Sequence, residues 1–239
     1  MDEDSAATTA VIEYSLDKET WTTYTYGDTI NLSSIGDKVY FRGDNARLSS
    51  HINHDYDECY NQYYFEMGGL IAGGGNIMSL LDKTCTQTTV PPVSFFGMFA
   101  GCHSLTSAPT LPATTLAEDC YCSMFASCHS LASAPTLPAT TLTEDCYAFM
   151  FSGCTSLTSA PALPATTLVE NCYDHMFGKC KSLNEVHVSF TAWTNNDIKF
   201  TISWLNLVSS TGTFYCPSGL NTTTRGISRV PKGWTVTNV

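Results

Sequence analysis

The strongest constraint on this chain is a 26-residue segment that occurs three times in succession. The copies begin at Leu111, Leu137 and Leu163, and each opens with the letters LPATTL. Self-similarity at a fixed period of about 20–50 residues is typical of arrays in which each unit packs only against its neighbours. The sequence therefore predicts an array of about four to five units. A Met-Phe pair marks the same period at Met98, Met124, Met150 and Met176.

Each copy predicts a short helix followed by a short strand. Thr115–Glu118 has the S/T-x-x-E pattern of a capping box, in which both side chains satisfy free N–H groups at a helix start. Apolar residues at positions 120, 121, 124, 125 and 128 then form a stripe that indicates a helix of two or three turns. Ser130–Ser133 predicts a strand that ends at Pro135, because proline lacks the N–H that a strand ladder needs. The equivalent leucines would lie on adjacent parallel strands; they are Leu105, Leu131, Leu157 and Leu183.

These units resemble BspA-like leucine-rich repeats, which occur in surface proteins of gut and oral anaerobic bacteria. The likeness rests on Phe151–Leu157 (FSGCTSL), on the LPATTL motif and on the final Pro231–Val236 (PKGWTV). It covers residues 76–239 well and the N-terminal part more loosely. The resemblance implies a curved solenoid with a surface or adhesive role, and it carries no catalytic residues.

The predicted fold class is mixed α/β. We expect a leucine-rich-repeat-type solenoid of 26-residue units, each with a short parallel strand and a short helix, preceded by an N-terminal antiparallel β module. Four segments of the module, rich in β-branched and aromatic residues, predict the strands of a small sandwich. They are Val11–Leu16, Trp21–Tyr26, Thr29–Leu32 and Lys38–Arg42. The expected division is a flexible leader at 1–9, the β module at 10–68, the solenoid at 69–184 and a C-terminal cap at 185–239.

The C-terminal cap is expected to close the core of the array. Phe200–Leu205 and Gly212–Cys216 have the composition of short strands. Trp204 and Trp234 are the side chains that would seal the last unit.

The cysteines follow the repeat. Seven of the eleven occupy two repeat positions, which favours buried free thiols over disulfides, because neighbouring rungs would have parallel Cβ vectors. The seven are Cys102, Cys128, Cys154 and Cys180 at one position and Cys120, Cys146 and Cys172 at the other. The repeat leaves Cys59, Cys85, Cys122 and Cys216 unassigned, and any disulfide would come from these four.

The charge and the N-terminus narrow the possible partners and locations. A formal net charge of −11 argues against nucleic acid and anionic membranes as partners. No apolar run reaches the roughly 18–20 residues of a membrane span. The first ten residues lack the basic region and apolar core of a signal peptide. Either a leader has been removed, as export of the resembling family implies, or the protein is a phage virion protein made without one.

No constellation of residues predicts catalysis. The paired acids at Glu118-Asp119 and Glu144-Asp145 recur at expected helix starts, which favours capping roles over catalytic ones. His51–Cys59 is rich in His and acidic residues, but its spacing matches no metal site, so it is interpreted as a solvated loop. We therefore predict no enzyme activity, no catalytic residue, no metal and no cofactor.

The candidate binding surface comes from positions that vary between otherwise similar units. Constant positions build the core, so variable ones face outward, and repeat arrays bind through such extended surfaces. Relaxed drift on an unused face would give the same variation. Exposed aromatic residues make good contact anchors. The predicted binding residues, on the helix side, are Phe149, His175, His129 and Lys181, which would form one stripe along the array, together with Tyr121, Tyr147 and Tyr173 beside them. The competing surface is the strand face, at Thr106, Ala132, Thr158 and Asn184.

The predicted function is that of a non-enzymatic, cell-surface or secreted bacterial protein that binds a host protein, a glycan or a neighbouring cell. The first alternative is a structural or receptor-binding virion protein of a phage infecting such bacteria. The weaker alternative is a glycan-active enzyme with its site near His51–Cys59.

Overall fold

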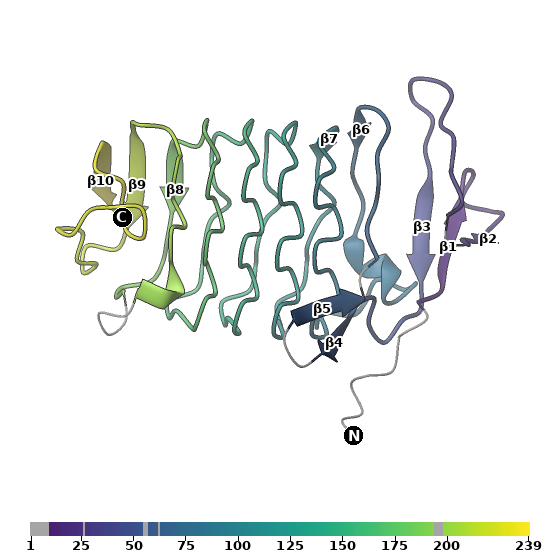
Figure 1. Ribbon diagram of the computed structural model, residues 1–239, viewed down its shortest axis with the longest axis horizontal. Helices are drawn as coiled ribbons and strands as arrows, with labels where there is room; N and C mark the ends of the chain where they lie inside the picture. The colour runs from purple at the N-terminus through teal and green to yellow at the C-terminus, as the bar shows by residue number, and fades with distance from the viewer. Residues whose placement is uncertain (1–9, 26, 55–56, 62, 194–197) are drawn as a thin grey trace.

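The protein is an elongated array of side-by-side chain segments, flanked by a small sheet at each end (Figure 1). The computed structural model describes residues 10–25, 27–54, 57–61, 63–193 and 198–239; for 50–54, 57–61 and 198 only the backbone is described. In the described chain, the strands form four small, separate sheets.

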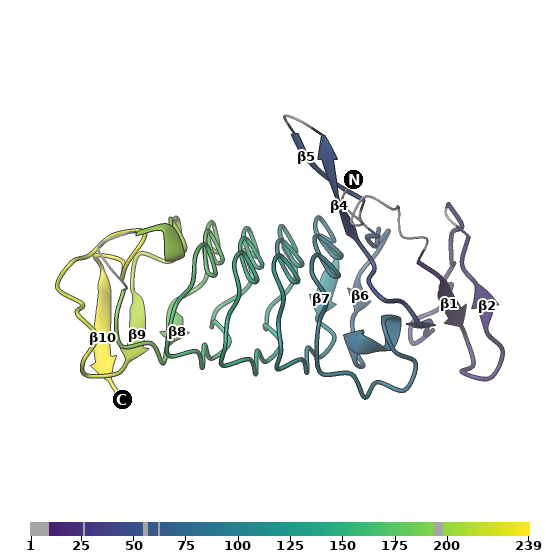
Figure 2. The ribbon, with the colours of Figure 1, turned by 90° about the horizontal axis from the view of Figure 1, so that it is seen from below.

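The N-terminal part contains two of these sheets. Its first three strands pair antiparallel in the order β2-β1-β3, and they are β1 (Ile12–Ser15), β2 (Thr22–Thr23) and β3 (Tyr40–Gly43). The next two, β4 (Ser50–His54) and β5 (Asp57–Asn61), form a separate hairpin that projects from the array in Figure 2. Thr29–Leu32 is not a strand, so the predicted sandwich is wrong.

The segments predicted to be helices are ribbons of consecutive turns. We call residues 92–101, 118–127, 144–153 and 170–179 the turn ribbons. Within one ribbon, the N–H groups of Cys122 and Ala126 donate to carbonyls three residues earlier, at 3.1 and 2.9 Å. The N–H groups of the alternate residues Tyr121, Ser123 and Phe125 donate instead to the next unit, at 2.8–3.2 Å. Each ribbon is therefore hydrogen-bonded to its neighbour as a strand is in a parallel ladder.

The predicted fold class, a leucine-rich-repeat-type solenoid of strands and helices, is wrong. In the described chain the only helical segments are two short 3-10 helices, η2 (Ile77–Leu80) and η3 (Ile198–Phe200). Every fourth residue of a ribbon has a positive φ, as at Asp119 (54°), Ser123 (56°) and Ser127 (61°), and this conformation interrupts an α-helix. The acidic pairs do not cap helices: the second residue of each pair occupies the first left-handed position, which Asp and Asn tolerate better than most residues.

The predicted row of parallel strands is also wrong. Of the four leucines, only Leu105 lies in a strand, β7 (Leu105–Ser107), which pairs with β6 (Ile71–Ala72). In the last unit, strand β8 (Glu185–His187) begins two residues after Leu183. Leu131 and Leu157 lie in the units between them and are fully buried, but they are not in strands. Pro135 and Pro161, which follow these two leucines, each remove one of the backbone donors that a continuous ladder would need.

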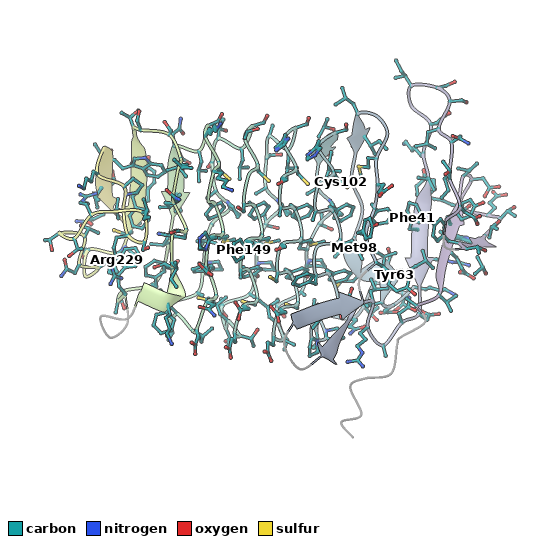
Figure 3. The ribbon with its side chains drawn as sticks, in the orientation of Figure 1. Phe41, Tyr63, Met98, Cys102, Phe149 and Arg229 are labelled. Carbon is teal, nitrogen blue, oxygen red and sulfur yellow. The ribbon has the colours of Figure 1, made fainter. Side chains whose placement is uncertain are left out.

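Two columns of aromatic rings run through the core. One contains Phe99, Phe125, Phe151 and Phe177, with ring centroids 5.4–5.7 Å apart. The other contains Phe95, Tyr121, Tyr147 and Tyr173 and ends on Trp204, with centroids 5.6–6.3 Å apart. Figure 3 shows side chains of successive units in parallel rows along the array. Each ring thus packs on the ring at the equivalent position of the next unit, as expected for units that repeat every 26 residues.

The repeated cysteines are buried free thiols, as predicted. The Sγ–H of Cys128 donates to the carbonyl of Phe99 at 3.1 Å, and Cys154 and Cys180 make the same bond in the following units. Burial raises the pKa of the Cys128 and Cys180 thiols to about 12. Cys85, Cys122 and Cys216 are free as well, and the side chain of Cys59 lies outside the described residues.

The burial of these thiols predicts a labelling pattern. In the native protein, the seven repeated cysteines should resist alkylation at neutral pH, because they are protonated and out of contact with solvent. In denaturant without reductant, at least seven groups should react. Half-buried Cys85 should label first among the described cysteines, and Cys85→Ser removes that signal as a control. Mass spectrometry after timed labelling measures both states, and fewer than seven reactive groups on denaturation would mean that the columns are cross-linked.

The C-terminal sheet closes the array. Its strands are parallel in the order β10-β9-β8, where β9 is Gly212–Cys216, as predicted, and β10 is Trp234–Asn238. Trp204 and Trp234 are buried. The strand expected at Phe200–Leu205 is absent; that segment comprises the end of η3 and turns.

Candidate binding surface

The seven predicted binding residues separate into a buried set and an exposed set. Tyr121, Tyr147 and Tyr173 belong to the second ring column and are at most 2% exposed. These three tyrosines therefore belong to the core and are not part of the candidate binding surface. Phe149, His175, His129 and Lys181 all have solvent-accessible side chains.

Phe149 and His175 form one stacked pair, which we call the ring pair. Their ring centroids lie 4.7 Å apart, and the ring planes differ by 4°. Both residues occupy the same left-handed position in consecutive turn ribbons, with φ values of 56° and 49°. Phe149 is 38% exposed and lies midway along the array, where Figure 3 labels it. A bulky side chain is uncommon at positive φ, so the hydrogen bonds of the ribbon keep Phe149 in a backbone conformation that is unfavourable for phenylalanine by itself.

Carboxylates border the ring pair. His175 Nδ1 lies 2.5 Å from Asp174 Oδ1. Burial raises the pKa of Asp174, and the hydrogen bond to His175 opposes that shift. Burial also raises the pKa of Asp145, against the hydrogen bond from Asn171, and the nearby carboxylates of Glu144, Asp174 and Glu118 raise it further. The surface thus combines aromatic faces with hydrogen-bond acceptors, which suits a ligand with apolar faces and polar edges.

His129 and Lys181 lie in a different column of the surface. His129 stacks on His103 of the preceding unit, with ring centroids 4.4 Å apart. The next two positions of that column are Thr155 and Lys181, and Lys181 is exposed. The structure therefore brings Phe149 together with His175, and His129 together with His103.

The competing strand face ends in a polar cluster that the repeat pattern did not predict. Thr106, Ala132, Thr158 and Asn184 are exposed, as expected for that face. Beyond Asn184, Glu185 Oε1 accepts a hydrogen bond from Ser159 Oγ at 3.2 Å and lies 3.1 Å from His187 Nε2. His187 stacks on Tyr215 of β9, with centroids 4.1 Å apart. The alternation of polar and apolar residues could have indicated this cluster, because buried Val186 between two polar residues places Glu185 and His187 together on the outer face.

A shallow depression of about 160 Å³ lies between segments 134–138 and 161–164, which belong to consecutive units. Its lining is formed mainly by prolines and small residues, together with Leu137; the full set is Ala134–Pro138, Pro161, Ala162 and Pro164. Small-molecule sites usually have about 300–1,000 Å³, so this depression is too small to enclose such a ligand.

The side chains of His51–Cys59 lie outside the described residues. Among the side chains that the structure does describe, no three or more His, Cys, Asp or Glu gather into a metal cluster. No helix of the described chain is long and apolar enough to cross a membrane.

In comparisons with known proteins, no family model, no curated protein and no solved structure matched this chain.

Proposed function

We propose that this protein is a non-enzymatic binding protein that recognises a protein or a glycan through the ring pair of Phe149 and His175. The observation that carries this proposal is their exposed stack, 4.7 Å between centroids, on a backbone fixed by hydrogen bonds to the neighbouring units. The N–H groups of Phe149 and His175 donate across units at 2.7 and 2.8 Å. Because the scaffold is already ordered, little conformational entropy would be lost on binding.

The surface chemistry supports a ligand with both apolar and hydroxyl or cationic groups. Aromatic rings give large contact areas, and such residues dominate binding energy at interfaces. Asp174 and Asp145 add acceptors beside the rings, and the formal net charge of −11 favours a neutral or basic ligand. A cell-surface or extracellular location belongs to the same proposal. This surface, and not the curved solenoid that the BspA-like resemblance implied, supports the proposal.

Screening of glycan and protein arrays would identify a ligand, and variants of the ring pair then test the surface. Ser123 occupies the equivalent position in the preceding unit, so Phe149→Ser and His175→Ser should fold. We expect the double variant to weaken binding about 30-fold or more, because loss of a binding hot spot costs about 2 kcal/mol.

Thr158→Arg on the strand face is the matched control and should leave the affinity unchanged. Surface plasmon resonance against the identified ligand measures all of these variants. Unchanged affinity in the ring-pair variant, together with loss of binding in Thr158→Arg, would place the binding surface on the strand face.

A further inference from the structure

Phe149 of the ring pair has one face on which the described chain places no partner. His175 stacks on one face, and among the described residues no ring or cation stacks on the other. That second face points toward the preceding unit, where Ser123 occupies the equivalent left-handed position with a φ of 56°. Ser123 N–H donates to the Ala148 carbonyl at 2.8 Å, so the two positions lie on hydrogen-bonded neighbouring ribbons. Serine is much shorter than phenylalanine and cannot cover this face, which we call the Ser123 face.

Carboxylates border the Ser123 face. Asp119 and Asp145 occupy the left-handed positions four residues before Ser123 and Phe149, one turn away in the same two ribbons. Within the described chain, the only hydrogen-bond donor to the Asp145 carboxylate is Asn171 Nδ2, at 3.4 Å. Burial raises the pKa of Asp145 against this hydrogen bond, and neighbouring carboxylates raise it further. The charge of Asp145 therefore has no cation of the described chain beside it.

The basic side chains lie on the opposite side of the ring pair. In the ribbon of His175, Asn171 replaces the aspartate at the first left-handed position, and Lys179 occupies the third, with a φ of 65°. Lys199 of the next unit lies with its Nζ 3.4 Å from Glu170 Oε1. A positively charged ligand is therefore favoured on the Ser123 face and disfavoured on the side of His175.

A guanidinium group fits the Ser123 face by both shape and charge. It is planar and permanently charged, it stacks on aromatic faces, and it donates paired hydrogen bonds to a carboxylate. The array also supplies a suitable distance. Rings in consecutive ribbons stand 4.7 Å apart at Phe149 and His175, and a cation is attracted to a ring within about 6 Å of the centroid. A guanidinium level with the Ser123 ribbon would therefore stack on Phe149.

The N-terminal sheet of this chain already contains the same combination of groups. The guanidinium carbon of Arg42 lies 3.8 Å from the ring centroid of Trp21. Arg42 Nε donates to Glu13 Oε2 at 2.7 Å. An aromatic ring and a carboxylate thus hold one arginine at the surface. Phe149 and Asp145 provide the ring and the carboxylate, and no arginine of the described chain stacks on Phe149.

We propose that the Ser123 face of Phe149 binds an arginine side chain of a partner protein, whose guanidinium stacks on the ring and donates to Asp145. This inference rests on the proposed function of the ring pair and narrows its ligand from a protein or a glycan to a protein with an exposed arginine. The formal net charge of −11 adds a long-range attraction for a basic surface.

NMR titration of the full chain with N-acetyl-arginine amide tests this site, with the ring signals of Phe149 as the readout. Phe149→Ser identifies these signals, because they are missing from its spectrum. The arginine probe should shift them in a saturable way. N-acetyl-lysine amide has the same charge without the planar group, and N-acetyl-citrulline amide has a planar group without the charge. Each of these two probes should bind about tenfold more weakly or less well still.

Two variants change the site itself. Ser123→Phe puts a ring in the place of the guanidinium and should abolish the shift of Phe149; it should fold, because Phe149 occupies the same position one unit later. Asp145→Asn should weaken arginine binding about tenfold, and it should fold because Asn171 is its equivalent. Glu185→Gln removes one negative charge from the strand face, so it is the matched control and should leave the titration unchanged.

The ligand found by array screening separates failure of this inference from failure of the proposed function. Suppose that the ring-pair variant loses that ligand. The arginine site would then still be overturned, with the ring pair kept as the binding surface, by any of three results: no saturable shift of Phe149, equal binding of the lysine probe, or an arginine shift that persists in Ser123→Phe. A glycan as the ligand would overturn it in the same way. Full affinity of the ring-pair variant for the ligand would instead overturn the proposed function, and the arginine site with it.

Discussion

Phe151→Ala is expected to lower the free energy of unfolding by about 3–5 kcal/mol, the cost of deleting a fully buried phenylalanine ring. Phe151 is 0% exposed and lies between Phe125 and Phe177, with centroids 5.6 and 5.7 Å away. Its removal leaves a cavity in the middle of a ring column. The neighbouring rings are fixed by the hydrogen bonds between units, so they cannot collapse into the space.

Phe149→Ala is the matched control for this prediction. Phe149 is two residues earlier in the same turn ribbon, but among the described side chains it stacks only on His175, and it is 38% exposed. Its loss should cost less than about 1.5 kcal/mol, the upper range for one aromatic pair. Urea denaturation followed by circular dichroism measures both variants. Equal losses of stability in the two variants would show that the buried ring column contributes no more to the free energy of unfolding than the exposed ring pair does.

Trp204→Ala should also lower the free energy of unfolding by about 3–5 kcal/mol, here by removing a ring at the C-terminal end of the core. Trp204 is 0% exposed and ends both ring columns. Its indole Nε1–H donates to the carbonyl of Arg229 at 3.0 Å, which ties the C-terminal segment to the array. The variant would lose the ring contacts and that hydrogen bond together. The rings packed on Trp204 are Tyr173, Phe177, Phe190, Trp193 and Phe214.

Trp204→Phe separates these two contributions. It keeps an aromatic ring and removes the indole donor, so the lost hydrogen bond should account for only about 0.5–1.5 kcal/mol, in addition to the smaller ring volume. Thermal unfolding and the labelling rate of buried Cys216 measure the two variants. If Cys216 stayed protected in Trp204→Ala, Trp204 would not be what holds the C-terminal sheet in place.

The positions of the core residues could be predicted from the sequence, whereas the backbone that carries them could not. Buried Cys120, Tyr121, Met124, Phe125 and Cys128 repeat every four residues. An α-helix repeats every 3.6 residues, and over nine residues the difference from four stays within the width of one apolar stripe. Only the left-handed residues reveal the turns, and they are hard to recognise because Ser, Phe, His and Lys occupy them as well as Asp, Asn and Gly.

The candidate site was predicted in part. Variation between units correctly indicated that Phe149 and His175 are solvent-accessible. The single stripe predicted for these two with His129 and Lys181 is wrong, because the four residues belong to two different columns. Tyr121, Tyr147 and Tyr173 are identical in every unit, which is the property of a core position, and they are buried. The stack of His129 on His103 depends on both rings facing outward at the same height. The cluster around Glu185 depends on where β8 and β9 pair, which no short-range pattern specifies.

At the left-handed positions of the turn ribbons, the exposed side chain can change while the backbone hydrogen bonds that stabilise the array stay the same. In successive units one such position is occupied by Gly97, Ser123, Phe149, His175 and Ser203, all at similar positive φ. The backbone bonds of the ribbon are the same whichever side chain stands there, and each residue other than glycine has a fixed conformational cost of about 1–2 kcal/mol. Duplication of a unit therefore adds one more left-handed position at which the side chain can change. A new binding surface can then arise by single substitutions, without any change in the backbone.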